Sequence, residues 1–498
     1  MSEPERSARA IHLSLVSHTN IGKTALARTL LGQDVGEVRD AAHVTDEAAG
    51  HTLLRTAQGD ELQLWDTPGF GDSTRLLRRL RQSGRPLGWL LGQAWDRWRD
   101  RPFWASQQAM RHVVEQADVM LYLVSAAEAP AAAAYVDSEM ELLAWVGKPV
   151  IVLLNQLGAP REAALEAAEI EAWRQHLAAR AFVEQVLPMD AFARCWVQES
   201  VLLRAVEGCV GDDQRAAMAR LIGQWQRQRL ATFDASVRLL ADSLAAAAAT
   251  RQDLSDVSGL KSRLRALGRA LGIGAAENNP TALAQVALAA QLEQRSREDV
   301  TALVRLHGLA GEAQTQIVQR LATHYEARLR MDEGKAAWVG GAIAGALAGL
   351  KADLATGGLT LGGGTLAGGV LGALSGAGLA RCVNLVRGTD TSWLAWNAQA
   401  LDAMLEAALL RYLAVAHFGR GRGEWVASET PAHWQGAVSA VLATRRAAIT
   451  ALWQRGNRQL DVPAVRQLAS QLQAIIEASL RELLLRLYPQ APVPVAVP

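Results

Sequence analysis

The residue types and spacing near the N-terminus point to binding of nucleotide phosphates and a metal ion. Segment 17–24 reads Ser-His-Thr-Asn-Ile-Gly-Lys-Thr. Gly22 permits close backbone approach, Lys23 supplies charge for the outer phosphates, and Thr24 supplies a hydroxyl for magnesium. Ser17 stands where the usual pattern has its first glycine. The candidate phosphate-binding residues are Thr19, Asn20, Ile21, Gly22, Lys23, Thr24 and Ala25.

A second motif, Asp66-Thr-Pro-Gly69, follows about forty residues later. Asp66 ends a short, mostly apolar strand at 61–65, where an aspartate holds magnesium through water. The amide of Gly69 would sense a terminal phosphate. An ordinary Pro-Gly turn is the alternative. It is disfavoured because two phosphate-site motifs occur in the expected order and spacing.

These residues need a scaffold, and roughly the first 210 residues alternate strand-like and helix-like segments. Strands separated by helices predict a mostly parallel sheet with right-handed crossovers. Ligands bind at the carboxyl ends of such strands, which is where Ser17, Asp66 and Asn155 fall. The strands are predicted at 10–16, 61–65, 117–124, 148–155 and 183–188, and the helices at 25–31, 135–146, 161–180 and 193–206.

An insertion from about 73 to 104 interrupts this alternation and is rich in arginine and tryptophan. One interpretation is a basic, aromatic surface that docks a protein partner or anionic lipid. The other is an amphipathic helical pair packed on its own domain. Its arginines and tryptophans are Arg75, Arg78, Arg79, Arg81, Arg85, Arg97, Arg99, Arg101, Trp89, Trp95, Trp98 and Trp104.

The C-terminal half is predicted to be mostly α-helical, because the strand signal vanishes after about residue 212. A helical region is expected over 213–335, with long helices at 213–252 and 281–333 and a break over 268–280. A second helical region over 383–498 should be helical from 393 to 488 and end in a loose Pro-rich tail.

A glycine-rich, apolar hairpin is expected between these helical regions, over 336–382. Glycines recur there every fourth residue, which lets another helix approach closely. Three interpretations stay open: membrane contact through 336–380, a buried glycine-zipper hairpin, or a flexible linker. The repeated glycines are Gly341, Gly345 and Gly349, then Gly364, Gly368, Gly372 and Gly376.

Composition limits the function classes. Half of the 498 residues are apolar and 20% are charged, so the chain can bury cores and is not disordered. The net charge of +1 favours no nucleic-acid partner, and none is expected. Three scattered cysteines without a CxxC pair fit a reducing cytosol and no zinc site. The polar N-terminus lacks an apolar signal core, so a cytoplasmic location is expected, with the inner face of the cell membrane as the alternative.

The first 210 residues resemble the Era/TrmE branch of small bacterial GTPases. The likeness rests on segments 17–24, 66–70 (Asp-Thr-Pro-Gly-Phe) and 153–156 (Leu-Leu-Asn-Gln), and more weakly on 43–46 (His-Val-Thr-Asp). The whole chain looks like bacterial proteins in which such a domain precedes a helical domain of unknown function. The resemblance implies a P-loop NTPase fold that binds GTP and GDP and hydrolyses GTP slowly with Mg²⁺.

The same resemblance implies roles for single residues. Lys23 would contact the outer phosphates, Thr24 and Thr45 would ligate Mg²⁺, Asp66 would hold it through water, and Gly69 would donate its amide to the γ-phosphate. Lys23, Thr45 and Gly69 are therefore the expected catalytic residues.

Asn20 stands where potassium-stimulated members of this branch bind K⁺ through an asparagine. A K⁺ ion there could neutralise charge in the manner of an arginine finger. The alternative role for Asn20 is a loop residue that hydrogen-bonds its own backbone.

The guanine-reading motif departs from the family pattern. The family has Asn-Lys-x-Asp, whereas this chain has Asn155 and Gln156 followed by Leu157 and Gly158. The missing aspartate would accept two hydrogen bonds from guanine, so its loss should relax base specificity. GTP remains the expected nucleotide, ATP use is an alternative, and Asp190 could substitute for the missing carboxylate.

The predicted function is a GTP-hydrolysing conformational switch that acts at a membrane or on a protein partner, with self-association open. One alternative is a nucleotide-binding scaffold with little turnover, favoured by Ser17 and by Phe70 in place of a water-orienting glutamine. The other is a dynamin-like membrane remodeller, which the helical half and the glycine hairpin favour.

Overall fold

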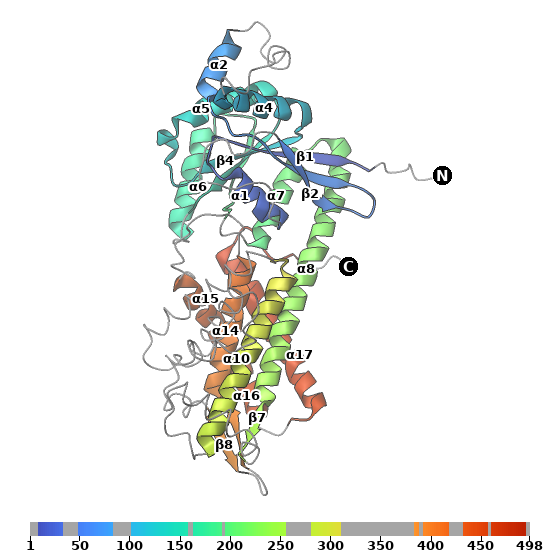
Figure 1. Cartoon of the computed structure of the whole chain (residues 1–498), viewed down its shortest axis with the longest axis vertical. Helices are drawn as coiled ribbons and strands as arrows, with labels where there is room; N and C mark the ends of the chain where they lie inside the picture. The colour runs from blue at the N-terminus through green and yellow to red at the C-terminus, as the bar shows by residue number, and fades with distance from the viewer. Residues whose placement is uncertain are drawn as a thin grey trace, which may run out of the picture. The chain divides into compact units, whose positions relative to one another are not determined.

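A computed structural model describes residues 8–32, 48–82, 101–157, 163–191, 195–254, 280–309, 383–387, 392–417, 432–456 and 460–494. Thr45, residues 83–100 of the insertion and the predicted hairpin over 336–382 lie outside the described residues. The chain divides into two compact units (Figure 1). Unit 1 holds residues 1–230, 417–425 and 494–498, and unit 2 holds 231–416 and 426–493.

Unit 1 is built on a six-stranded sheet in the order β2-β3-β1-β4-β5-β6. β3 and β4 pair in parallel with β1, and β4, β5 and β6 follow in parallel, which confirms the predicted mostly parallel sheet. The strands are β1 (Ala10–Ser17), β2 (Ala49–Arg55), β3 (Glu61–Asp66), β4 (Val119–Ser125), β5 (Val150–Asn155) and β6 (Val183–Pro188).

Strand β2 was not predicted from the sequence. It is an edge strand that pairs antiparallel with β3, and only Leu54 of its seven residues is buried. A strand with so little buried surface carries no apolar alternation, so its position depends on the pairing with β3 rather than on local pattern.

Helices cover both faces of this sheet, which explains why β4 and β5 are buried along their whole length. On one face, β4 and β5 pack against α2, α4 and α5 through a shared apolar core. The helices of unit 1 are α1 (Lys23–Leu31), α2 (Ser73–Arg81), α4 (Arg101–Gln116), α5 (Ala134–Val146), α6 (Ala163–Leu177) and α7 (Trp196–Cys209).

The described part of the insertion packs on unit 1. Helix α2 buries Leu76 and Leu80 against that core. The guanidinium of Arg81 pairs with Glu141 of α5, and that of Arg75 lies 4.7 Å from the centroid of the Phe103 ring. The packed-helix interpretation therefore fits α2 and the start of α4.

The first part of α8 (Asp212–Ala249) is held to the rest of unit 1 by ion pairs. The Arg220 guanidinium donates to both oxygens of Asp60 at 2.7 and 2.8 Å. The Trp225 indole and Arg229 both donate to Glu199 of α7. The division between the two units consequently falls inside this helix, after residue 230.

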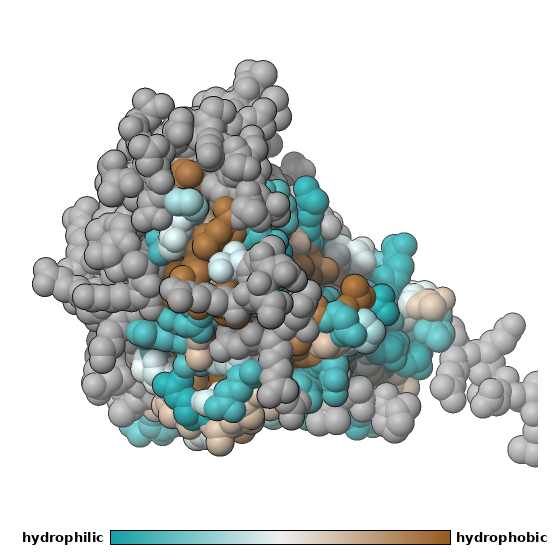
Figure 2. Space-filling view, turned by 90° about the horizontal axis from the view of Figure 1, so that it is seen from below, coloured by the Kyte–Doolittle hydropathy of each residue, from teal (hydrophilic) through white to brown (hydrophobic). Residues whose placement is uncertain are grey.

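Unit 2 is mostly helical, as predicted. Its central helix α14 is buried on most sides and contacts α10, α15 and α16. Figure 2, which views the molecule from below, shows hydrophobic residues next to hydrophilic ones among the coloured atoms. The helices, besides the rest of α8, are α10 (Pro280–Leu306), α14 (Ala398–Ala416), α15 (Ala432–Thr444), α16 (Arg446–Gly456) and α17 (Val462–Leu487).

Unit 2 also contains strands, so the prediction that no strand follows residue 212 was wrong. Strands β7 (Arg251–Asp253), β9 (Ser392–Trp396) and β8 (Val383–Arg387) form an antiparallel sheet in that order. The three strands are at most five residues long, and β7 pairs with residues about 140 positions away. Such short, long-range pairing leaves little local signal.

Two predicted helix boundaries were wrong, one at the start of a helix and one at the end of another. The helix expected from 393 starts at Ala398, because the Asn397 side chain accepts the amide hydrogen of Ala400 as an N-cap. The helix expected to reach 333 ends at Leu306, and Gly308 just beyond it has φ +67°. A glycine in this left-handed conformation is a common helix terminator.

The C-terminal tail is not loose where it is described. Ala491 is 3% exposed, Val493 is 9% exposed, and the Ala491 amide donates to the Tyr488 carbonyl. Burial of two apolar side chains holds this segment, which the Pro-rich pattern did not indicate. Among the described helices, none combines the length and apolar character needed to cross a bilayer.

Candidate nucleotide-binding site

The phosphate loop joins the end of β1 at Ser17 to the start of α1 at Lys23. Gly22 has φ +94°, and a Cβ on it would lie 2.8 Å from Asn155 Nδ2, so no other residue fits there without strain. Asn20 also has a positive φ of 65°, which asparagine tolerates better than most residues, and it is exposed. The loop thus leads directly into the N-terminus of α1, and helix N-termini bind anions.

Lys23 is buried in this loop at 8% exposure, and its Nζ donates to Ser17 Oγ at 3.0 Å. Ser17 Oγ in turn donates to the His18 carbonyl at 2.5 Å. Burial lowers the pKa of Lys23, while the nearby Asp66 and Glu139 carboxylates oppose that shift. The serine that departs from the glycine pattern therefore supplies a hydroxyl that holds the lysine.

The metal position predicted at Thr24 and Asp66 has a matching geometry. Thr24 Oγ1 donates to Asp66 Oδ2 at 2.5 Å. Asp66 is 4% exposed, and its other oxygen, Oδ1, has no hydrogen-bond partner among the described residues. Burial raises the pKa of Asp66, and the Thr24 hydrogen bond opposes the rise.

These residues fit Mg²⁺. A buried carboxylate oxygen without a partner is rare in proteins, and a bound cation is one group that would satisfy it. The described residues contain no group of three His, Cys, Asp or Glu side chains arranged for a metal. Mg²⁺ is usually held by one or two protein oxygens together with waters and substrate phosphates, which is what Thr24 and Asp66 would leave room for.

The segment after Asp66 lies against the phosphate loop. The Phe70 amide donates to the Ser17 carbonyl at 2.9 Å, and the Thr19 amide donates to the Phe70 carbonyl at 3.3 Å. A Cβ on Gly69 would meet Lys23 Nζ at 2.9 Å and the backbone Cα of Thr19 at 3.0 Å, so any larger residue would have to push the phosphate loop away. Gly69 therefore lies beside the lysine that would contact the outer phosphates.

Ser106 of α4 holds the chain that continues from this segment into α2. Its Oγ accepts the amide hydrogens of Gly71 at 3.0 Å and Asp72 at 3.1 Å, and it donates to the Pro102 carbonyl. Sequence reasoning missed Ser106, because a single serine within a helix carries no signal of this role.

Asn155 connects three segments at the end of β5. Its Nδ2 donates to the Ile21 carbonyl at 2.7 Å, and its Oδ1 accepts the Ala191 amide hydrogen at 2.9 Å. The side chain is fully buried, so both bonds are protected from water. Gln156 follows with φ +57°, and its Oε1 accepts the Ser125 hydroxyl at 2.9 Å. Its side chain is thereby tied to the end of β4.

Asp190 follows β6 and lies next to the sequence that departs from the guanine-reading motif. Its Oδ2 accepts the Leu157 amide hydrogen at 2.7 Å, and the residue is 5% exposed. Gly158 lies outside the described residues. The fold thus brings a carboxylate to within one residue of the position where the family pattern has its aspartate.

The ends of β1, β3 and β5 bring together most of the predicted site residues. Lys23, Thr24 and Asp66 lie together at the predicted phosphate and metal position, and the Asn155 side chain is hydrogen-bonded to the loop at Ile21. Thr45 cannot be placed, since it lies outside the described residues.

Comparison with protein-family models divides the chain in two. Residues 174–483, more than half of the chain, match the family described as a domain of unknown function, DUF3482. Residues 12–156 match MMR_HSR1, described as 50S ribosome-binding GTPase. No curated protein sequence matches the chain.

Among solved structures, the chain is similar to Era from Aquifex aeolicus bound to GDP and AlF₄⁻, at 17% identity and a TM-score of 0.30. It is similar to Era in complex with MgGDPNP and part of the 16S ribosomal RNA, at 16% identity and a TM-score of 0.31. Each match covers 41% of this chain and 58% of the Era chain. The FeoB G-domain from Methanococcus jannaschii matches at 14% identity and a TM-score of 0.22, over 43% of this chain and 98% of the other.

Proposed function

The chain belongs to the family of the domain of unknown function DUF3482, with a P-loop GTPase domain ahead of that domain, and from this premise we propose that it binds and hydrolyses GTP as a conformational switch. The observation that carries the proposal is the pairing of Thr24 with Asp66 beside a buried Lys23, with Asp66 Oδ1 left without a hydrogen-bond partner among the described residues. These groups match what a magnesium-bound triphosphate requires.

Lys23 neutralises charge on the outer phosphates, and the amides of residues 19–25 surround them. Thr24, Thr45 and Asp66 would hold Mg²⁺, which when bound neutralises the charge that develops on the phosphates. The Gly69 amide would donate to the terminal phosphate, and the close approach of Gly69 to Lys23 Nζ supports this role.

Turnover is expected to be slow without help. Phe70 follows Gly69, and its buried phenyl ring has no hydrogen-bonding group that could orient a water molecule. In this proposal Asn20 binds K⁺, which supplies the missing positive charge; its exposure and position in the loop leave it open to an ion. The buried Phe70 also favours the alternative of a nucleotide-binding scaffold with little turnover.

The base preference in this proposal is guanine. Asp190 would accept hydrogen bonds from the guanine edge in place of the absent aspartate, because its carboxylate is already anchored to Leu157. Asp190→Asn should therefore weaken GTP binding and favour a xanthine nucleotide, whose 2-oxo group can accept from the new amide. A variant that keeps its preference for GTP over ATP and XTP would remove Asp190 from this role.

The output of the switch is a conformation that acts on a protein partner or at a membrane, with self-association open. The apolar, glycine-rich sequence over 336–380 supports membrane contact. Ribosome binding, which the GTPase family's description names, is a further outcome that sedimentation with 50S subunits would reveal. Domain boundaries near 212, 335 and 382 belong to the same proposal, and limited proteolysis would test them.

The test is binding of labelled GTP, GDP and ATP to the full-length chain, with phosphate release followed in the same samples. Mg²⁺ is present or chelated, and K⁺ is compared with Na⁺. Magnesium-dependent GTP binding with potassium-stimulated release supports the proposal and the role of Asn20. Binding without release favours the scaffold. Nucleotide-dependent assembly on liposomes would instead favour a membrane remodeller.

A further inference from the structure

A buried carboxylate lies next to the phosphate loop, outside the sequence motifs of the site. Glu139 of α5 is fully buried. Its Oε1 lies 2.8 Å from His18 Nδ1, and its Oε2 accepts the Tyr122 hydroxyl at 2.6 Å. A carboxylate is expensive to bury unless its oxygens are hydrogen-bonded, and here both have a partner.

The imidazole on that carboxylate belongs to the second residue of the phosphate loop. The ring of His18 stacks on Tyr135, with ring centroids 4.6 Å apart and planes 29° from parallel. The His18 backbone forms a bridge with Phe70. The side chain and the backbone of His18 are therefore held by different parts of unit 1.

A chain of contacts leads from Glu139 to the lysine of the site. Glu139 holds His18, the His18 carbonyl accepts the Ser17 hydroxyl, and Ser17 Oγ accepts from Lys23 Nζ. Burial raises the pKa of Glu139, and the hydrogen bond to His18 opposes the rise. Movement of the imidazole would move the carbonyl on which the Ser17 hydroxyl, and with it Lys23, depends.

We propose that Glu139 is a positioning residue of the phosphate site, which holds the first turn of the phosphate loop in place through the His18 imidazole. Residues that fix the geometry of binding groups act through locked rotamers and supporting hydrogen bonds, as this pair does. The inference rests on the proposed binding of GTP. It adds that Glu139, a residue of α5, fixes the geometry of the phosphate loop.

The test uses full-length variants and equilibrium binding of a fluorescent GTP analogue with Mg²⁺. Glu139→Ala and His18→Ala should each weaken binding about tenfold, the effect of losing one charge-assisted hydrogen bond. The double variant should bind no more weakly than Glu139→Ala alone, because both changes break the same hydrogen bond.

Two further variants separate positioning from general stability. Glu139→Gln should recover binding to within about threefold, since its amide oxygen can accept from Tyr122 and its N–H can donate to the imidazole nitrogen of the matching tautomer. Tyr122→Phe removes the other hydrogen bond to the same carboxylate. It should lower the unfolding temperature yet change GTP affinity less than about twofold, because His18 stays anchored.

The proposal is overturned if His18→Ala binds the analogue as tightly as the wild type, or if Tyr122→Phe weakens binding as much as Glu139→Ala does. If Glu139→Ala fails to fold, His18→Ala decides alone, since the imidazole is 32% exposed and its loss removes less buried packing than loss of the fully buried Glu139 side chain. Wild-type protein that binds no GTP, or binds it equally after Lys23→Ala, would instead reject the proposed function and is recognised without any Glu139 variant.

Discussion

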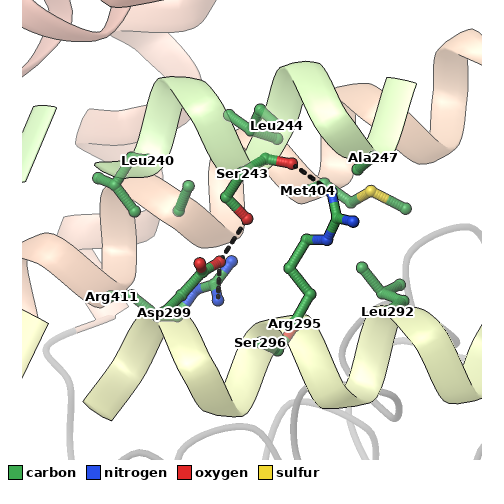
Figure 3. Close-up of a pocket in the computed structure, with 11 residues that line it drawn as sticks. Leu240, Ser243, Leu244, Ala247, Leu292, Arg295, Ser296, Asp299, Met404 and Arg411 are labelled. Carbon is green, nitrogen blue, oxygen red and sulfur yellow. Dashed lines mark hydrogen bonds and ion pairs between the residues drawn. The ribbon is translucent and has the colours of Figure 1, made fainter. Parts of the chain in front are cut away.

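The two units of this chain both bury charged side chains, but they arrange them differently. In unit 1, Lys23 and Asp66 lie beside each other at the end of the sheet, and one Asp66 oxygen has no hydrogen-bond partner among the described residues. In unit 2, Asp299 of α10 lies 3.6 Å from Arg411 of α14 and accepts the Ser243 hydroxyl of α8 at 2.6 Å (Figure 3).

The surroundings of the two clusters explain the difference. The unit 2 cluster borders a cavity of about 10 Å³, room for roughly one water molecule. Its other walls include Leu240, Leu292 and Met404 (Figure 3). Charges enclosed in this way serve to join three helices. The charges of unit 1 lie at the carboxyl ends of parallel strands, which is where ligands bind in sheets of this kind. Buried charge alone therefore does not indicate a binding site.

Breaking the unit 2 cluster should have the largest effect. Asp299→Ala leaves Arg411 buried without its counter-charge, which should lower the free energy of unfolding by about 3–5 kcal/mol. Urea unfolding followed by circular dichroism measures it. The matched control replaces both partners, Asp299→Leu with Arg411→Met, and should recover most of the loss. If the single variant is as stable as the wild type, the pair does not hold the helices.

Removing the lysine of unit 1 should act on binding instead. Lys23→Ala should weaken GTP binding about 100-fold, because alanine cannot form the charge-assisted bond that the lysine makes to phosphate. Stability should not fall, since burial already disfavours the charged lysine. Isothermal titration measures the affinity and thermal unfolding measures the stability. Lys148→Ala is the control: Lys148 donates to the Val113 and Val114 carbonyls away from the site, so its replacement should cost stability and leave binding unchanged.

A smaller effect is expected from the amide that ties the loop to the sheet. Asn155→Ala removes the buried bonds to the Ile21 carbonyl and the Ala191 amide, which should weaken nucleotide binding about tenfold. Ser125→Ala, which removes only the bond to Gln156, should change affinity by less than about threefold. Equal weakening in the two variants would contradict a special role for Asn155.

The smallest effect is expected from a structural ion pair of unit 1, between Asp60 and Arg220. Hydrogen bonds from Arg220 lower the pKa of Asp60 below its unfolded value. Its contribution to stability is therefore complete above the unfolded pKa of about 4 and is lost as the pH falls through the folded pKa. Asp60→Asn should cost about 1 kcal/mol at neutral pH and flatten the dependence below pH 4. Unfolding curves measured across about pH 2.5–7 would give the pH dependence of the free energy of unfolding. A dependence with the same slope in the variant and the wild type would contradict the prediction.

The sequence predicted the parallel strands and the site residues that lie in short, contiguous patterns. Gly22, Lys23 and Thr24 act through a loop whose geometry is local, and Asp66 and Gly69 belong to one turn. The edge strand β2 and the sheet of unit 2 were missed because β2 buries a single residue, the strands of unit 2 are short, and β7 pairs with residues about 140 positions away.

By itself, the sequence determined that a phosphate loop, an aspartate and an asparagine follow three strands of a mostly parallel sheet, because each depends on residue type and local backbone conformation. Only the tertiary structure decided that Ser17 holds Lys23, that Asp66 keeps an oxygen without a partner among the described residues, and that Glu139 meets His18 from 121 positions away. Such contacts depend on which helix faces cover the sheet. The long-range packing of the whole core determines this, and a short stretch of sequence does not specify it.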